Sequence, residues 1–101
     1  MYGLLGLTAK AGKLGFGTES CLEMIFKKKA KLVIVAEDSS ERTIENFKEK
    51  CKQNNIDLYI FGKKDDLSKS IGKVNKTVIC IRDKNLAGAI KKILDGGDVI
   101  G

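Results

Sequence analysis

Three glycines come shortly before a threonine that can begin a helix, and this arrangement could bind a phosphate group or the edge of a base. Gly12, Gly15 and Gly17 precede Thr18. Free backbone N–H groups at a helix start, the positive end of the helix dipole and small side chains together favour an anion. The segment contains neither the Gly-Lys-Ser/Thr of a phosphate loop nor a complete GxGxxG pattern. The alternative is a glycine turn in which Thr18 only caps the helix.

Basic residues are concentrated between positions 63 and 92. The lysines and arginines of this stretch are Lys63, Lys64, Lys69, Lys73, Lys76, Arg82, Lys84, Lys91 and Lys92. Only three aspartates oppose them, so this stretch matches the net charge of +6 of the whole chain. In a parallel sheet Lys63 and Lys64 would follow one strand and Arg82 to Lys84 the next, at the edge where open α/β sheets bind ligands. A polyanion is the expected partner, and a solvated lysine-rich surface is the alternative.

The residue types of the chain exclude most catalytic chemistry. It has no histidine, which rules out Ser-His and Cys-His couples and every metal site that contains histidine. Glu37 and Asp38 could resemble a metal site, but Mg²⁺ usually needs a further carboxylate or a phosphate nearby. An enzyme would need an acid/base pair, and the carboxylates and lysines show no paired spacing. We therefore expect no enzymatic activity, no metal and no cofactor.

Three cysteines and the length of the chain indicate one soluble domain. Cys21, Cys51 and Cys80 form no CxxC pair and are odd in number, so we expect reduced, buried thiols. With 101 residues and 43% hydrophobic content, a single domain over residues 1–101 can bury its own core. No apolar run approaches the roughly 18 residues of a membrane helix, and the N-terminus lacks the pattern of a signal peptide. We expect a cytoplasmic monomer with no membrane contact.

The hydrophobic pattern alternates between strands and helices. Short apolar runs at 32–36, 58–61 and 78–81 predict strands that are covered on both faces, and 13–17 predicts a short strand or turn. Helical spacing covers the ranges 2–11, 18–28, 39–54, 65–72 and the residues between Asn85 and Gly96. The alternation predicts a three-layer α/β/α sandwich with a mostly parallel sheet, without setting the strand order.

Three residues are expected to cap these helices. Thr18 would cap the second helix and Asn85 the last, and Asp38 with Glu41 resembles a capping box at the third.

Three segments carry a resemblance to a known family. LGLTAKAGK at 5–13, AKLVIVAED at 30–38 and IRDKNLA at 81–87 resemble the ribosomal protein L7Ae family, and more narrowly its small bacterial YlxQ-type members. The resemblance covers essentially the whole chain. It implies an L30e-like α/β/α sandwich with a small mixed, mostly parallel sheet. It also implies binding of structured RNA, kink-turns above all, without catalysis.

The family's RNA loop has the pattern Gly-Thr-Asn-Glu-x-x-Lys at the start of the second helix. Gly17 and Thr18 match it, whereas Glu19 and Ser20 replace the asparagine and the glutamate, and Glu23 replaces the lysine. A lysine donates to guanine O6 and N7, but a carboxylate only accepts, and it repels phosphate. These departures put recognition of a standard kink-turn in question.

The resemblance also places lysines and an arginine in the RNA site. Lys64 and Lys69 lie in a segment similar to the family's Lys-x-x-Leu-Gly-Lys, with Ser68 in place of the glycine, and Arg82–Asn85 corresponds to a loop that contacts unpaired bases. The expected RNA-binding residues, on one surface, are Lys13, Gly17, Thr18, Glu19, Ser20, Lys64, Lys69, Arg82 and Lys84. Lys13, Lys64 and Lys69 would neutralise phosphates. Arg82 and Lys84 would approach splayed bases.

Two classes of partner follow from these residues. The first is structured RNA, either ribosomal or kink-turn-like, in a ribonucleoprotein that can include ribosomal or translation-associated proteins. The alternative is a protein-interaction module that docks on a ribosome-associated or acidic protein through its lysines. Glu19 and Glu23 motivate this alternative, because they remove the family's RNA contacts.

Overall fold

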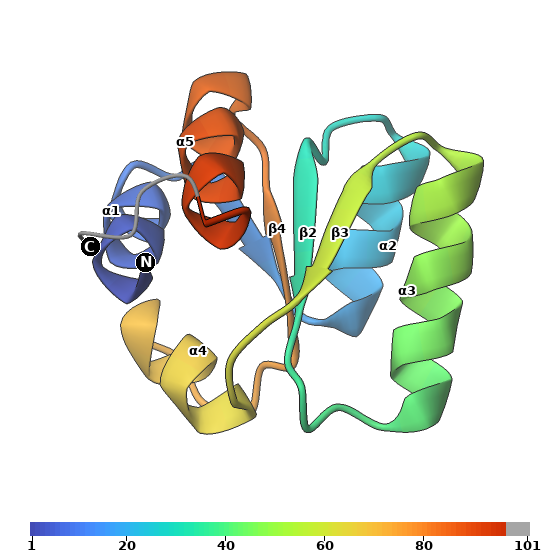
Figure 1. Cartoon of the computed structure of the whole chain (residues 1–101), viewed down its shortest axis with the longest axis horizontal. Helices are drawn as coiled ribbons and strands as arrows, with labels where there is room; N and C mark the ends of the chain where they lie inside the picture. Colours follow the sequence, from blue (N-terminus) through green and yellow to red (C-terminus); the bar gives the residue numbers. More distant parts are fainter. Residues whose placement is uncertain (97–101) are drawn as a thin grey trace.

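Nine helices and strands alternate along the part of the chain that the computed structural model describes, residues 1–96 (Figure 1). In chain order they are α1 (Tyr2–Lys10), β1 (Leu14–Phe16), α2 (Thr18–Phe26), β2 (Leu32–Val35), α3 (Glu41–Gln53), β3 (Asp57–Ile60), α4 (Lys64–Ser70), β4 (Val78–Ile81) and α5 (Lys84–Leu94). Each predicted segment forms the predicted type of element, and residues 13–17 form a strand rather than only a turn.

The four strands form one mixed sheet in the order β1-β4-β2-β3. β4 lies between β1 and β2 and runs antiparallel to both, while β2 and β3 pair in parallel. The expectation of a mostly parallel sheet is therefore wrong, because two of the three pairings are antiparallel. The cause is the insertion of β4 beside β2 in the opposite direction.

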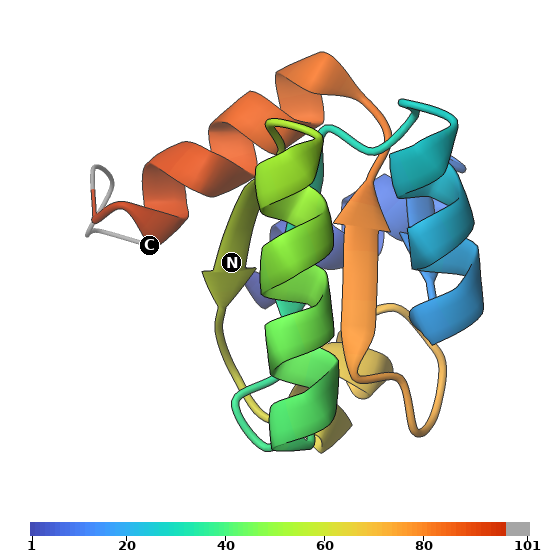
Figure 2. The ribbon, with the colours of Figure 1, turned by 90° about the vertical axis from the view of Figure 1, so that its right-hand side faces the viewer.

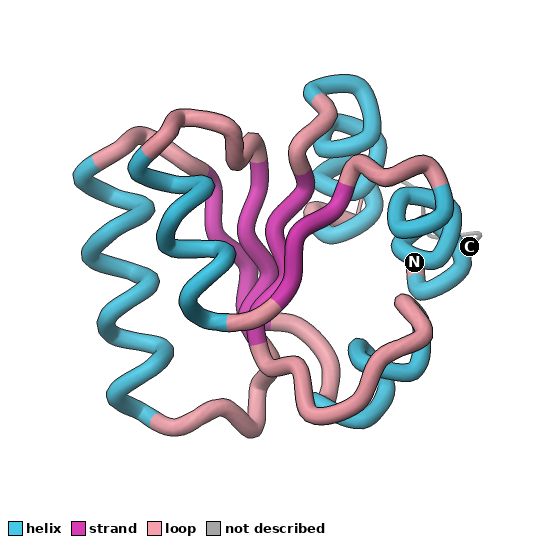
Figure 3. The backbone as a smooth tube through the Cα atoms, turned by 180° about the vertical axis from the view of Figure 1, so that it is seen from behind, coloured by secondary structure: helices cyan, strands magenta, loops and turns pink. Residues whose placement is uncertain are grey.

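Helices cover both faces of the sheet, which confirms the predicted α/β/α sandwich (Figure 1, Figure 3). α1, α4 and α5 pack on one face, where Leu5, Leu67 and Ile90 are fully buried. α2 and α3 pack side by side on the other face, where Ile25 and Phe47 are buried (Figure 2). All residues of β2 and β4 are buried, as predicted for strands covered on both faces. β3 is an edge strand and is only half-buried, contrary to that prediction.

The helix caps differ from the predicted ones. Gly17, not Thr18, is the N-cap of α2. Ser40 caps α3 by accepting from the N–H of Thr43. Asp83 caps α5 by accepting from two backbone N–H groups, so that Asn85 lies inside the helix. In each case the cap is one or two residues from the expected position, within the usual uncertainty of helix ends.

The three cysteines are free and buried, as predicted. They lie in the core between the sheet and the α2–α3 layer. Burial raises the pKa of the Cys51 thiol to about 11. Among the described residues, no helix has both the length and the apolar composition that crossing a bilayer requires.

Candidate nucleic-acid interface

The start of α2 is open to a ligand. Gly17 has φ 92° and ψ 152°, and a Cβ added there would meet nothing within 4 Å. This backbone conformation, rather than lack of space, therefore requires glycine. No side chain of residues 1–96 caps the helix, and Thr18, Glu19 and Ser20 are exposed. The N–H groups of the first turn are consequently available to an anion.

The backbone before α2 is fixed against the neighbouring strand. The N–H of Gly17 donates to the carbonyl of Val78 at 2.9 Å. Gly15 is buried, and a Cβ at this position would lie 2.5 Å from the Sδ of Met24 and 2.8 Å from the Sγ of Cys80. Glycine at position 15 therefore permits the close approach of β1 to α2 and β4, and this contact fixes the place where α2 begins.

The loop between α4 and β4 is held in place by one buried hydroxyl group. Ser68 is only 2% exposed, and its Oγ accepts from the N–H of Lys76 at 2.8 Å and donates to the carbonyl of Lys76 at 3.1 Å. The N–H of Lys73 donates to the carbonyl of Ser68 at 2.8 Å. The residue that replaces the family's glycine thus attaches this loop to α4.

This loop lies beside the start of α2 (Figure 2), and it carries two lysines that contact the end of β1. The Nζ atoms of Lys73 and Lys76 lie 5.0 and 5.3 Å from the ring centroid of Phe16, the last residue of β1. These are cation–π distances. Val74 is 75% exposed. It lines a hollow together with Lys73, Lys76 and Lys69 of α4. We define the glycine-turn surface as Phe16, Gly17, Thr18, Lys69, Lys73, Val74 and Lys76.

Two carboxylates stand on α2 next to the glycine-turn surface. Glu19 and Glu23 are exposed. The carboxylate of Glu23 accepts from Lys27 at 2.6 Å, and this hydrogen bond holds the pKa of Glu23 below its usual value. Glu23 therefore stays ionised at neutral pH, and α2 presents hydrogen-bond acceptors where the family pattern has a lysine donor.

The acidic residues that follow β2 have a structural role. The carboxylate of Asp38 accepts from the backbone N–H of Lys64 at 2.8 Å, and that of Glu37 accepts from the N–H of Gly62 at 2.9 Å. They hold the turn between β3 and α4, so the expectation that Asp38 caps α3 is wrong. Lys64 lies at the same end of the sheet as Gly17, because β1 and β3 both run parallel to β2.

The structure separates the expected site residues into two groups. Gly17, Thr18, Glu19, Ser20, Lys64 and Lys69 lie at the end of the sheet where β4 begins. Lys13, Arg82 and Lys84 lie at the opposite end, where β4 ends and where the N–H of Arg82 donates to the carbonyl of Lys13 at 2.8 Å. The prediction of one continuous surface is wrong, because it assumed parallel strands and β4 is antiparallel.

The side chains of the loop that precedes β4 are not predicted from the sequence as part of this surface. The basic stretch includes Lys73 and Lys76 without a role for either, and no motif points to Phe16 or Val74. One signal was available: Val74 is an isolated apolar residue between Lys73 and Asn75, in a run that is otherwise polar. The contact with Phe16 depends on the strand order and could not be read from spacing.

Comparisons with known proteins identify the family and relatives of this chain. The model of the ribosomal protein L7Ae/L30e/S12e/Gadd45 family matches residues 1–91. RNA-binding protein YlxQ of Enterococcus faecium is 34% identical over 93 residues, which cover 92% of this chain and 89% of that protein. RNA-binding protein YlxQ of Bacillus subtilis (strain 168) is 30% identical over 94 residues, which cover 93% of this chain and 94% of that protein.

Solved structures show the same fold. A protein of unknown function from Bacillus halodurans C superposes with a TM-score of 0.91 at 28% identity, over 93% of this chain and 95% of that one. The Giardia lamblia 15.5kD RNA binding protein superposes with a TM-score of 0.79 over 94% of this chain and 84% of that one, and at 22% identity it supports the fold alone. From the family match and the two relatives, the chain belongs to the ribosomal protein L7Ae/L30e/S12e/Gadd45 family.

Proposed function

We propose that this chain is an RNA-binding module that holds structured RNA of the kink-turn kind on its glycine-turn surface. Two relatives at 34% and 30% identity carry the name RNA-binding protein YlxQ, which supports RNA as the partner over the protein-interaction alternative. Membership of this family also agrees with the prediction that the chain is not an enzyme.

One observation carries the proposal: the loop before β4 is attached to α4 and lies against the open start of α2. In this arrangement the N–H groups of Thr18, Glu19 and Ser20 donate to phosphate oxygens. Lys64 and the three lysines of the glycine-turn surface neutralise further phosphates. Val74 provides an apolar contact for a base that has left its stack.

The carboxylates on α2 set what kind of base edge this surface accepts. Glu19 and Glu23 can accept from an exocyclic amino group, such as N4 of cytosine, but they cannot donate to O6 and N7 of guanine. The chain therefore binds a kink-turn less selectively than the family's lysine pattern would allow. Phosphate contacts and the loop before β4 supply most of the affinity.

A titration of the full chain against a kink-turn RNA and a mutated kink-turn RNA, each at two salt concentrations, tests this proposal. Each phosphate contact contributes roughly 0.7 to 0.9 to the slope of log affinity against log salt. Replacing Lys73 and Lys76 by glutamine (K73Q/K76Q) should lower that slope by roughly 1.5. Lys92→Gln is the control, because it removes one exposed charge of α5 outside the glycine-turn surface.

Two results would contradict the proposal. One is the absence of salt-dependent binding to either RNA, which together with a nuclease-resistant protein partner would indicate the protein-interaction role. The other is RNA binding that K73Q/K76Q leaves unchanged in affinity and salt slope, because the glycine-turn surface would then not carry it.

A further inference from the structure

The strongest excess of positive charge lies at the end of the sheet opposite the glycine-turn surface. The loops before β1 and β2 and the β4–α5 turn lie at this end, at the top of Figure 1, and these segments carry six basic residues. We define the basic end as Lys13, Lys28, Lys29, Lys31, Arg82 and Lys84. All six are exposed.

Backbone hydrogen bonds between these segments fix the basic end. The N–H of Lys31 donates to the carbonyl of Ile81 at 2.7 Å, and that of Arg82 donates to the carbonyl of Lys13 at 2.8 Å. These bonds join the starts of β1 and β2 to the end of β4. Five of the six basic residues line one hollow of about 340 Å³, together with Gly12 and Asp83. The charges are therefore held in one place by the sheet.

Carboxylates do not neutralise the basic end. Among residues 1–96, none of its six side chains takes part in an ion pair, whereas the neighbouring Lys27 and Lys91 pair with Glu23 and Asp57. Asp83 is the one carboxylate of the described residues that lines the hollow, and it accepts from the N–H groups that begin α5. Asp57 lines a neighbouring pocket with Lys31 and Lys84, and it pairs with Lys91. The basic end thus keeps its charge for an external anion.

Local stability does not explain these charges. Lys28 has φ 59°, a left-handed conformation that favours glycine or asparagine. Lys84 lies in the first turn of α5, where the helix dipole disfavours a cation. The dipole of α2 favours Lys28 and Lys29 after its last turn, but it does not act on Lys13 or Arg82. Three chain segments therefore converge on a positive surface that the fold itself does not need.

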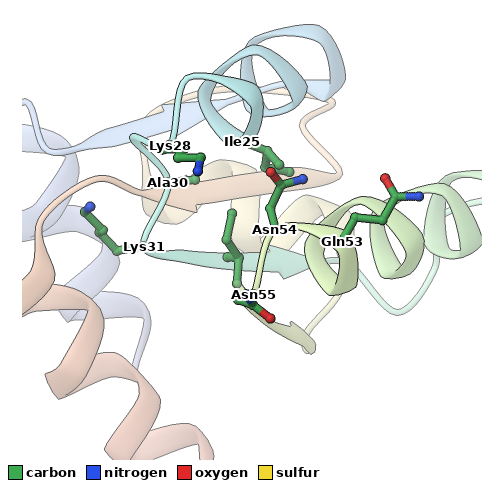
Figure 4. A pocket seen from close by; sticks show the side chains of 8 residues that line it. Ile25, Lys28, Ala30, Lys31, Gln53, Asn54 and Asn55 are labelled. Atoms are coloured by element: carbon green, nitrogen blue, oxygen red, sulfur yellow. The ribbon is translucent and has the colours of Figure 1, made fainter.

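The chemistry of the surroundings indicates the class of anion. Within the described part of the chain, no residue that lines the hollow is aromatic, so this hollow offers no platform on which the bases of a single strand could stack. Lys28 and Lys31 also line a neighbouring pocket of about 320 Å³, whose lining includes the amide residues Gln53, Asn54 and Asn55 (Figure 4). Lysines beside an amide suit the phosphates and 2′-hydroxyls that an RNA duplex displays.

We propose that the basic end is a second RNA-binding surface, which contacts the backbone of an RNA duplex while the glycine-turn surface holds a structured RNA. The proposal rests on the proposed function. Lys13 and Gly17 flank β1 and are separated by about 13 Å along the strand direction. Because the two surfaces lie at opposite ends of the strands, both can be occupied at once, and the chain then joins two RNA segments.

A capture experiment tests this second surface. The full chain is first saturated with a kink-turn RNA that carries one fluorophore, and a short RNA duplex with a second fluorophore is then titrated in while the anisotropy of each RNA is measured. Wild type should bind the duplex without releasing the first RNA. Replacing Lys28 and Lys31 by glutamine (K28Q/K31Q) should weaken duplex capture roughly tenfold and lower its salt slope by roughly 1.5. Lys92→Gln should change neither, and thermal melts verify that each variant is folded.

The outcomes separate this proposal from the proposed function. Binding of the first RNA without capture of the duplex overturns the second surface and leaves the proposed function intact. Displacement of the first RNA by the duplex also overturns it, because both RNAs would then share one surface. Capture that K28Q/K31Q leaves unchanged overturns the assignment to the basic end. Failure of the chain to bind the first RNA at all contradicts the proposed function.

Discussion

Glu23 stands where the family's RNA loop has a lysine, and its carboxylate is held by Lys27 at 2.6 Å. Glu23→Lys would exchange an acceptor for a donor that can reach guanine O6 and N7. Since one well-placed base contact discriminates by about 1–3 kcal/mol, we expect the ratio of affinities for intact and mutated kink-turn RNA to rise about tenfold. Equilibrium titrations of both RNAs measure that ratio. An equal gain for both RNAs would indicate only a charge effect and contradict the expectation.

Gly17 is the residue whose backbone opens the start of α2. Its φ of 92° lies in a region that residues with a Cβ rarely adopt. Gly17→Ala should therefore lower the free energy of unfolding by about 1–3 kcal/mol. Gly88→Ala is the matched control, because Gly88 lies inside α5 with nothing within 4 Å of an added Cβ. It should raise the stability by about 0.5–1 kcal/mol. If urea unfolding shows that G17A is as stable as wild type, the backbone conformation at position 17 does not require glycine.

At the scale of elements, Ser68 connects α4 to the loop that carries Lys73 and Lys76. Ser68→Ala removes both side-chain hydrogen bonds to the backbone of Lys76, which should cost about 1–3 kcal/mol of stability and weaken RNA binding. Ser70→Ala is the control on the same helix, since its hydroxyl donates only to the carbonyl of Leu67 at 2.7 Å. Denaturant unfolding and RNA titration should show a larger loss of stability and of RNA affinity in S68A than in S70A. Equal effects of S68A and S70A would show that the loop does not depend on Ser68.

β3 is connected to the end of α5 by a hydrogen bond from Tyr59 to Asp95 at 2.5 Å. This bond raises the pKa of Tyr59 to about 12. Because the folded value exceeds the unfolded value of about 10, the contribution of this bond to stability is complete below pH 10 and is lost as the pH rises to about 12.

Absorbance of tyrosinate during a pH titration measures this pKa. Asp95→Asn should lower the pKa of Tyr59 toward 10, because the charged acceptor is removed. The pKa of Tyr2, which burial raises above its ordinary value, should stay unchanged and serves as the internal reference. If Tyr59 titrates with the same pKa in wild type and D95N, the hydrogen bond from Tyr59 to Asp95 does not raise that pKa.

Periodicity predicted the elements well, because local residue types determine where a strand or helix forms. Periodicity does not predict which residues of a helix are buried, because tertiary contacts decide this. Helical spacing puts Phe26 one turn after the half-buried Leu22, yet Phe26 is 65% exposed. Helical spacing groups Leu4, Leu7 and Ala11 on one helical face, but in α1 Leu7 is 62% exposed and Leu5 is buried instead. Helical spacing identifies a face, whereas the neighbouring helices decide which edge of that face is covered.

At the scale of the whole molecule, strand direction divides the positive charge between two ends. The spacing of the glycines predicted the start of α2. The family resemblance predicted Lys64 and Lys69 as residues of the same site, and Lys64 lies at the same end of the sheet as Gly17. Neither could place Arg82 and Lys84, because their position depends on β4 running antiparallel between β1 and β2. The same pairing brings Lys73 and Lys76 to Phe16.

The claim that the glycine-turn surface binds RNA is tested most directly by NMR, with ¹H–¹⁵N spectra of the chain recorded during a titration with structured RNA. We predict that the amide signals of Thr18, Glu19 and Ser20 and those of Lys73 to Lys76 shift first and furthest, because these groups face the RNA. The signals of the exposed amides of α3 should not shift. Shifts confined to α3, or the absence of shifts at Thr18 and Val74 while RNA is bound, would contradict the claim.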